Sequence, residues 1–171
     1  KNCWFAGSVI CNAQKSYFGG FIGKVQKDST ILNCLNTGSI THNGSVTTNG
    51  VGAFAGYVVT GKLDILHSIN NGTLSVAGGQ NFGYFVGRAD ATVNAENSHS
   101  YNPRTWNFVY GKDNGTYATC GRYQVSDVAG INSLTQAKIG KLFTEEAARG
   151  YWSITEDSFP VLAAFAQESD S

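Results

Sequence analysis

Hydrophobic and polar residues recur along this chain in units of nearly constant length. The segment Gly19–Gly23 (GGFIG) returns as Gly52–Gly56 (GAFAG) and as Gly83–Gly87 (GYFVG), so the spacings are 33 and then 31 positions. A second motif, Ile31–Ile40, returns as Ile65–Leu74, which gives each repeat two landmarks. A period of this size is typical of proteins in which successive copies of one unit stack on each other.

Within each repeat, the apolar positions favour short strands. Phe21–Val25 and Phe54–Val59 are rich in β-branched and aromatic residues, which favour strands. The segments between the landmarks are rich in Gly, Ser, Thr and Asn, which is typical of turns. Stacked copies would pair each strand in parallel with its counterpart. Like residues would then form ladders, with Phe21, Phe54 and Phe85 facing inward.

Alternation along these strands predicts an outward face and leaves one question open. The residues three positions after each Phe are Lys24, Tyr57 and Arg88, which predicts that this column faces outward. The residues directly after each Phe would also point outward, although they are apolar. Either another part of the chain covers them or a bulge changes the alternation. These residues are Ile22, Ala55 and Val86.

Two further columns predict how the chain turns at its corners. The first column is expected to form an Asn-rich ladder whose side chains bond along the stack; it contains Asn2, Asn33, His67 and Asn97. The second column lies five residues later and contains Gly7, Gly38, Gly72 and Asn102. Because Gly and Asn best tolerate a left-handed backbone, positive φ is expected in this second column.

After about residue 105 the repeat decays and helix signals follow. Asn107–Asp113 is expected to start a last, irregular copy. Helix start and stop signals predict short helices at 133–139 and 144–150. Trp152–Ile154 and Phe159–Leu162 are expected to be closing strands. The chain thus divides into repeats in 1–120, a cap of the same domain in 121–165, which covers the last copy, and a tail in 166–171.

Composition and cysteine usage exclude some classes of protein. Lys and Arg together number 12, as do Asp and Glu, and no basic stripe suggests a nucleic-acid partner. No apolar run is long enough to span a membrane. Because Asn2 already matches the repeat, we expect this sequence to be part of a longer protein.

The four cysteines are Cys3, Cys11, Cys34 and Cys120, and none forms a CxxC pair, so a zinc knuckle is not expected. Cys3 and Cys34 share a column, and stacked strands lie about 4.8 Å apart, which is within disulfide range. Side chains that run parallel make a poor bridge, however. We therefore expect free, buried thiols, which leaves the redox compartment open.

The alternation of Gly-x-Phe-[Ile/Ala/Val]-Gly with Asn-Cys-x-x-x-Gly-Ser-[Val/Ile] resembles the GLUG-type repeats of large bacterial surface proteins. The stretches Ile131–Thr135, Trp152–Ile154 and Phe159–Leu162 are similar to the segment that often closes such arrays. The resemblance implies an all-β fold, a right-handed parallel β-helix (β-solenoid) of about four coils, with a small C-terminal cap that contains short helices. It also implies an extracellular, cell-surface or wall-attached protein. Proteins with such repeats include adhesin-like proteins and some immunoglobulin A peptidases, in which the repeats are accessory. It carries over no catalytic residue.

Two pairs of side chains are candidates for chemistry. His67 and His99 are 32 positions apart and are expected on adjacent copies, but a metal site needs a third ligand; alternatively, His67 stands in for Asn in its ladder. Asp64 and Glu96, also 32 apart, could form the carboxylate pair that glycoside cleavage requires, or be solvated surface charges. For both pairs we prefer the second interpretation, in which His67 replaces Asn in its ladder and the carboxylates are surface charges. No catalytic residue, metal or cofactor is therefore expected.

Aromatic residues gather where the repeats decay. Tyr101, Trp106, Tyr110 and Tyr123, with Tyr117 among them, are the candidate ligand-binding residues. They could bind a sugar or peptide, or pack the transition to the cap.

The function expected first is a non-catalytic stalk or adhesion module, whose partners would be a host glycan or host protein and other domains of the same polypeptide. The alternative is an accessory substrate-binding or spacer domain of a secreted protease or glycosidase. An autonomous polysaccharide lyase or hydrolase is a third hypothesis, supported by fold analogy alone.

Overall fold

The computed structural model describes residues 1–12, 16–44, 50–77, 81–100, 121–122, 148–153 and 160–166. The regular elements of these residues are strands, apart from one short 3-10 turn, which confirms the predicted all-β class. The strands form five sheets in which all pairings are parallel, and one antiparallel pair.

Each parallel sheet collects one strand from each repeat. Sheet A contains β1 (Trp4–Phe5), β6 (Leu35–Asn36), β11 (Ile69–Asn70), β16 (His99–Ser100) and β17 (Gly121–Arg122). Sheet B contains β2 (Ser8–Cys11), β7 (Ser39–His42) and β12 (Thr73–Val76). Sheet C contains β3 (Tyr17–Gly19), β8 (Gly50–Gly52) and β13 (Phe82–Gly83), and sheet D contains β4 (Ile22–Val25), β9 (Ala55–Val58) and β14 (Val86–Ala89). Sheet E contains β5 (Ser29–Leu32), β10 (Lys62–Leu66) and β15 (Thr92–Glu96).

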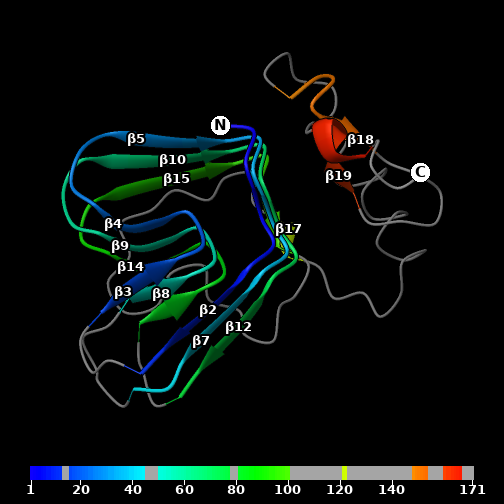
Figure 1. Cartoon of the computed structure of the whole chain (residues 1–171). Coiled ribbons are helices and arrows are strands. Elements are labelled where there is room, and N and C mark those ends of the chain that lie inside the picture. The colour runs from blue at the N-terminus through cyan, green and yellow to red at the C-terminus, as the bar shows by residue number, and fades with distance from the viewer. Residues whose placement is uncertain are drawn as a thin grey trace.

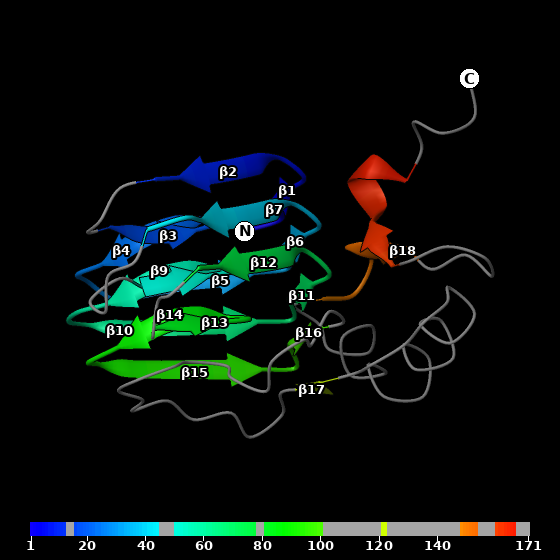
Figure 2. The same cartoon turned by 90° about the horizontal axis from the view of Figure 1, so that it is seen from below.

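The chain passes through sheets A to E in order, and we call one such passage a rung. Successive rungs stack in register, as Figure 1 and Figure 2 show from two sides. In sheet E, for example, Ile31 lies opposite Ile65, and Ile65 lies opposite Ala95. The stacking of like positions predicted from the repeat is therefore confirmed for the described strands.

A fourth copy of the sheet A strand is also confirmed, because Ser100 in β16 pairs with Asn70. One strand follows it in this sheet: β17, in which Gly121 lies opposite His99. The irregular copy expected from Asn107–Asp113 lies outside the described residues.

Sheets C and D are joined by a sharp bend in each rung and pack directly on each other. A Cβ on Gly52 would lie 2.2 Å from the Ala55 carbonyl oxygen. A Cβ on Gly50 would lie 2.2 Å from the Gly56 carbonyl oxygen. Only glycine permits this approach. Gly56, on the other side of Phe54, is also confined, because a Cβ there would lie 2.5 Å from the Phe18 backbone nitrogen. The two sheets form an arm, the C–D arm, that lies between sheets B and E (Figure 1).

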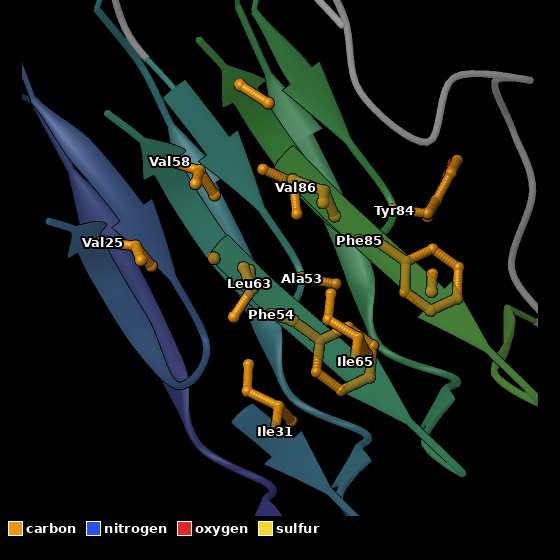
Figure 3. Packing of buried hydrophobic residues seen from close by; sticks show 14 of the residues in the cluster. Val25, Ile31, Ala53, Phe54, Val58, Leu63, Ile65, Tyr84, Phe85 and Val86 are labelled. Carbon is orange, nitrogen blue, oxygen red and sulfur yellow. The ribbon is translucent and has the colours of Figure 1, made fainter. Parts of the chain in front are cut away.

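The larger hydrophobic core lies on one side of the arm, toward sheet E (Figure 3). Phe54 and Phe85 are fully buried. Their ring centroids lie 5.4 Å apart, and the Phe21 ring lies 5.5 Å from that of Phe54. The inward aromatic ladder is therefore confirmed. On the other side of the arm, His42 of sheet B packs against Phe18 of sheet C, with ring centroids 6.0 Å apart.

The residues after each Phe are covered, which answers the question that alternation left open. Ala55 and Val86 are fully buried, and Ile22 in the first rung is partly buried. The Phe85 carbonyl accepts hydrogen bonds from both Phe54 N and Ala55 N, at 3.0 and 3.1 Å. The bend thus interrupts the alternation, and neighbouring residues can both be buried.

The prediction of positive φ in the glycine column was wrong. Positive φ is found instead in the column of Asn and His, with values of 58, 51, 48 and 47° at Asn2, Asn33, His67 and Asn97. Gly38 is needed for a different reason, because a Cβ there would lie 2.4 Å from the Gly7 carbonyl oxygen. Asn102 lies outside the described residues.

A ladder of buried side chains, joined by hydrogen bonds, runs through sheet A. Asn36 Nδ2 donates to Asn70 Oδ1, and Asn70 Nδ2 donates to Ser100 Oγ, both at 3.0 Å. Asn36 Nδ2 also contacts the Ala53 carbonyl oxygen at 3.2 Å, which ties sheet A to the tip of the arm. The repeat pattern did not predict this ladder, which is separate from the Asn-rich column expected at the corner.

Next to this ladder, the column that contains Cys3 and Cys34 is also hydrogen-bonded. Cys34 N donates to Ser68 Oγ at 3.1 Å, and Ser68 N donates to Ser98 Oγ at 3.1 Å. Cys3, Cys11 and Cys34 are free thiols, as expected, but Cys3 is exposed rather than buried. Burial raises the pKa of the Cys34 thiol.

The described end of the chain forms a small antiparallel pair, β18 (Trp152–Ser153) with β19 (Val161–Leu162), followed by the 3-10 turn η1 (Ala163–Phe165). The two closing strands are thus confirmed in these residues. The helix predicted at 133–139 lies outside the described part, as does most of the one at 144–150, of which 148–150 form a turn.

The C-terminal end meets the first rung, because the Trp4 and Phe165 rings lie 5.3 Å apart. The covering of the last copy by 121–165 stays a prediction, since most of that segment is outside the described residues. Among the residues that are described, no helix has the length and hydrophobicity needed to cross a membrane.

Candidate functional site

The aromatic residues predicted to bind a ligand lie outside the part of the chain that the structure describes. Tyr101, Trp106, Tyr110 and Tyr123 all lie outside the described residues, as does Tyr117. A different aromatic group lies on the described surface, where sheets C and D run side by side. It is built from two tyrosines and three charged side chains.

The two tyrosines come from different sheets and pack together. Tyr17 begins β3, and Tyr57 lies in β9 of the next rung, with their ring centroids 4.8 Å apart. Gly50, which lies opposite Tyr17 in the register, makes room for this contact, because a Cβ there would already touch the Tyr17 ring at 3.4 Å. Tyr17 is 36% exposed, whereas Tyr57 is only 8% exposed.

An ion pair fixes the Tyr57 ring. The Tyr57 hydroxyl donates to Asp90 Oδ2 at 2.6 Å. Arg88 donates to the same carboxylate from Nη2 at 3.0 Å and from Nε at 3.3 Å. The Arg88 guanidinium also lies 4.6 Å from the centre of the Tyr57 ring, within the range of a cation–π interaction.

This network shifts the ionisation of both donors. The hydrogen bond to the Asp90 carboxylate raises the pKa of the Tyr57 hydroxyl, and burial adds to the effect. The same carboxylate raises the pKa of Arg88. Tyr57 therefore stays neutral and Arg88 stays charged at ordinary pH, so the network keeps one arrangement.

Lys24 completes the group in the first rung. It lies opposite Tyr57, which lies opposite Arg88, so the three form one column across sheet D. Lys24 is exposed, and no described residue forms an ion pair with it. We call Tyr17, Lys24, Tyr57, Arg88 and Asp90 the Tyr57 cluster.

Part of this cluster follows from the repeat pattern of the sequence. The repeat predicted an outward column of Lys24, Tyr57 and Arg88, and the structure brings these residues together, although Tyr57 is buried beneath its neighbours. It missed Tyr17 and Asp90. Asp90 carried a usable signal, because it lies two positions after Arg88, a spacing that returns to the same face of a strand.

The two histidines of the candidate metal pair lie in different columns of the stack. His67 lies in the corner column, where its N–H donates to the Glu96 carbonyl and its φ is 48°. His99 lies opposite Ile69. The two histidines are therefore on adjacent copies, as expected, but they do not share a column. Among the described residues there is no group of three metal-ligating side chains. His67 therefore takes the place of Asn at a left-handed corner. Burial lowers the pKa of His99 to about 4.

The two carboxylates of the other candidate pair lie on neighbouring strands of sheet E but not directly opposite each other. Asp64 lies opposite Asn94 in sheet E, whereas Glu96 lies two residues further along the neighbouring strand. Asp64 accepts a hydrogen bond from Asn94 Nδ2 at 2.8 Å and forms an ion pair with Lys62 at 2.8 Å. Asp64 also raises the pKa of Lys62. This arrangement fits the interpretation of Asp64 as a surface charge.

Comparisons with known proteins give no further guide to the cluster. No protein-family model, no curated protein and no solved structure matches the chain. The function is therefore inferred from the geometry above and from the resemblance of the repeat motifs.

Proposed function

We propose that the chain is a right-handed parallel β-helix of about four coils with a small C-terminal cap, and that it serves as a non-catalytic module of a larger bacterial surface protein. It acts outside the cell as a rigid stalk or as a surface for adhesion. Host glycans or host proteins, and other domains of the same polypeptide, are its partners.

The observation that carries this proposal is the register of the stack. In every parallel sheet, each described strand bonds to the same position of the next repeat, and buried ladders such as Phe54 on Phe85 and Asn36 on Asn70 run along the same direction. Each rung bonds in register to the rungs next to it, and an array of this kind can extend in one dimension. The long direction is reinforced by hydrogen bonds, as a stalk requires.

The repeat motifs add the cellular context. Gly52–Gly56 and its counterparts resemble GLUG-type repeats, and the glycines in them are required by the close packing of the C–D arm. The resemblance thus involves positions that the fold depends on. GLUG-type repeats belong to secreted and wall-attached proteins, which supports an extracellular location.

The location can be tested on intact cells of the bacterium that makes the protein. Antibodies raised against the purified chain should label unpermeabilised cells or the cell-wall fraction. Labelling that appears only after the cells are opened would contradict the proposal. An assay of the purified chain on a panel of polysaccharides should give no turnover, and turnover would favour a lyase or hydrolase instead.

The alternative is an accessory substrate-binding or spacer domain of a secreted protease or glycosidase. The Tyr57 cluster supports this alternative as well, since a preformed aromatic and charged surface can hold a substrate for a neighbouring domain. The full gene separates the two: a cell-wall anchor supports the surface module, whereas an adjoining protease or glycosidase domain supports the accessory role.

A further inference from the structure

We propose that the Tyr57 cluster binds an acidic sugar residue of a glycan, with the sugar ring on Tyr17 and its carboxylate or sulfate on Lys24. This inference names the ligand of the adhesion surface and therefore rests on the proposed function. It follows from three properties of the cluster: an open aromatic face, an uncompensated positive charge and a fixed geometry.

The open aromatic face belongs to Tyr17. The Tyr17 ring packs on Tyr57, and the residue is 36% exposed, so Tyr17 offers surface to a ligand while Tyr57 supports it. The aromatic face carries partial negative charge, which suits the C–H groups on one face of a pyranose ring. By contrast, the exposed Trp4 ring packs against Phe165 and is already partnered.

The positive charge belongs to Lys24. Arg88 is neutralised by Asp90, which it contacts at 3.0 Å, so one unit of positive charge is left in the cluster. Lys24 is adjacent to Tyr57 across sheet D, where stacked strands lie about 4.8 Å apart. An anionic sugar is favoured here over a neutral one.

The geometry is fixed before a ligand arrives. The Tyr57 ring is held by its hydrogen bond to Asp90 and by the Arg88 guanidinium, and the Tyr17 ring is held in turn by Tyr57. A preorganised surface loses less conformational entropy on binding than a mobile one. Tyr57, Arg88 and Asp90 therefore position the platform, while Tyr17 and Lys24 contact the sugar.

The test is titration calorimetry on the whole chain with sialyllactose, a heparin oligosaccharide and an oligogalacturonate as acidic probes, and with lactose as the neutral probe. At least one acidic probe should bind 10-fold or more tightly than lactose, and its affinity should fall as salt is raised. Tyr17→Ala and Lys24→Gln should each weaken that binding about 10-fold, which corresponds to about 1.4 kcal/mol. Tyr17→Phe should retain it, because the ring is kept.

Lys62→Gln is the matched control, since Lys62 is an exposed lysine on sheet E that is paired with Asp64. It should leave binding unchanged, and a thermal melt should show that all four variants are folded. The inference is overturned if none of the acidic probes binds, or if Tyr17→Ala and Lys24→Gln bind as the unmodified chain does. Either result leaves the surface module intact, because antibody labelling of intact cells tests that function separately.

Discussion

Two buried ladders run through this molecule, and they are made of opposite chemistry. One stacks the rings of Phe21, Phe54 and Phe85 in the core beside sheet E, at centroid distances of 5.5 and 5.4 Å. The other stacks the amides of Asn36 and Asn70 in sheet A, joined by a hydrogen bond of 3.0 Å. Both arise because parallel strands in register place like residues on one another.

The difference between the ladders lies in what each residue needs from its neighbours. A buried Phe gains mainly from leaving water, and it gains this from any apolar surroundings. A buried Asn has to satisfy each donor and acceptor. Asn70 bonds to both neighbouring rungs, since its Oδ1 accepts from Asn36 Nδ2 and its Nδ2 donates to Ser100 Oγ. Its Oδ1 also accepts from Gly72 N of the same rung. The Asn ladder therefore specifies the register, whereas the Phe ladder mainly supplies stability.

The largest effect is expected from breaking the Phe ladder. Phe54→Ala should lower the free energy of unfolding by about 3–5 kcal/mol, because it leaves a cavity between two stacked rings in a fully buried core. Urea denaturation measures this loss. Ile10→Ala is the matched control, since Ile10 is an apolar residue that is 66% exposed, and it should change stability by less than about 0.5 kcal/mol. Equal losses in the two variants would contradict the inward assignment.

The next effect is expected from the Asn ladder. Asn70→Leu should cost about 3 kcal/mol, because the variant removes partners from Asn36, Gly72 and Ser100 while they remain buried. A double-mutant cycle with Asn36→Leu sharpens the comparison. The double variant should lose less than the sum of the two single losses, because each single change leaves the other amide without its partner. Strictly additive losses would show that the two amides do not act as one ladder.

The sequence was sufficient for the Phe ladder and not for the Asn ladder. The motif around Phe54 keeps one residue type in its central position, so the period alone predicts its stacking. The column of Asn36 and Asn70 contains Phe5 in the first rung and Ser100 in the fourth, and such a mixture conceals the shared chemistry. Only the register shows that Ser100 continues the amide chain with a hydroxyl.

The backbone error has a related cause. Gly and Asn both occur where φ is positive, but Gly also occurs where two backbones touch. A column of glycines in the sequence does not show which of the two reasons applies. At Gly38 the need is close approach, whereas at Asn33 it is a left-handed corner with φ of 51°. His67 adopts the same conformation, with φ of 48°, although its residue type gave a weaker signal.

The Tyr57 cluster could be predicted only in part for a spatial reason. Residues of one column, such as Lys24 and Tyr57, follow from the period. Tyr17 belongs to another sheet and reaches Tyr57 because the C–D arm folds sharply back on itself. A contact across a bend depends on the angle of that bend, which the repeat spacing does not contain.

His99 allows a third, smaller test of the buried interior, through pH. Burial lowers its pKa from the usual 6.5 to about 4. Between these values the unfolded chain binds a proton that the folded chain excludes, so stability falls as the pH is lowered through this window and levels off below it. Between pH 7 and pH 4.5 the loss due to His99 should be about 2 kcal/mol.

His99→Leu provides the reference for this measurement. Leu matches two apolar residues of this column: Ile69 lies opposite His99, and Leu35 lies opposite Ile69. The variant should show a smaller loss of stability over the same pH range in urea titrations, because it has no group to protonate. If the two chains lose stability equally, His99 is not the group that excludes the proton.

The smallest effect is expected where the same amide chemistry lies at the surface. Asn94 Nδ2 donates to Asp64 Oδ1 of the neighbouring rung at 2.8 Å, much as Asn36 donates to Asn70, but in sheet E these side chains face solvent. Asn94→Ala should therefore cost about 0.5 kcal/mol or less, because water replaces the lost partner and Lys62 still pairs with Asp64. A loss as large as that of Asn70→Leu would mean that contact between rungs, rather than burial, gives the interior ladder its importance.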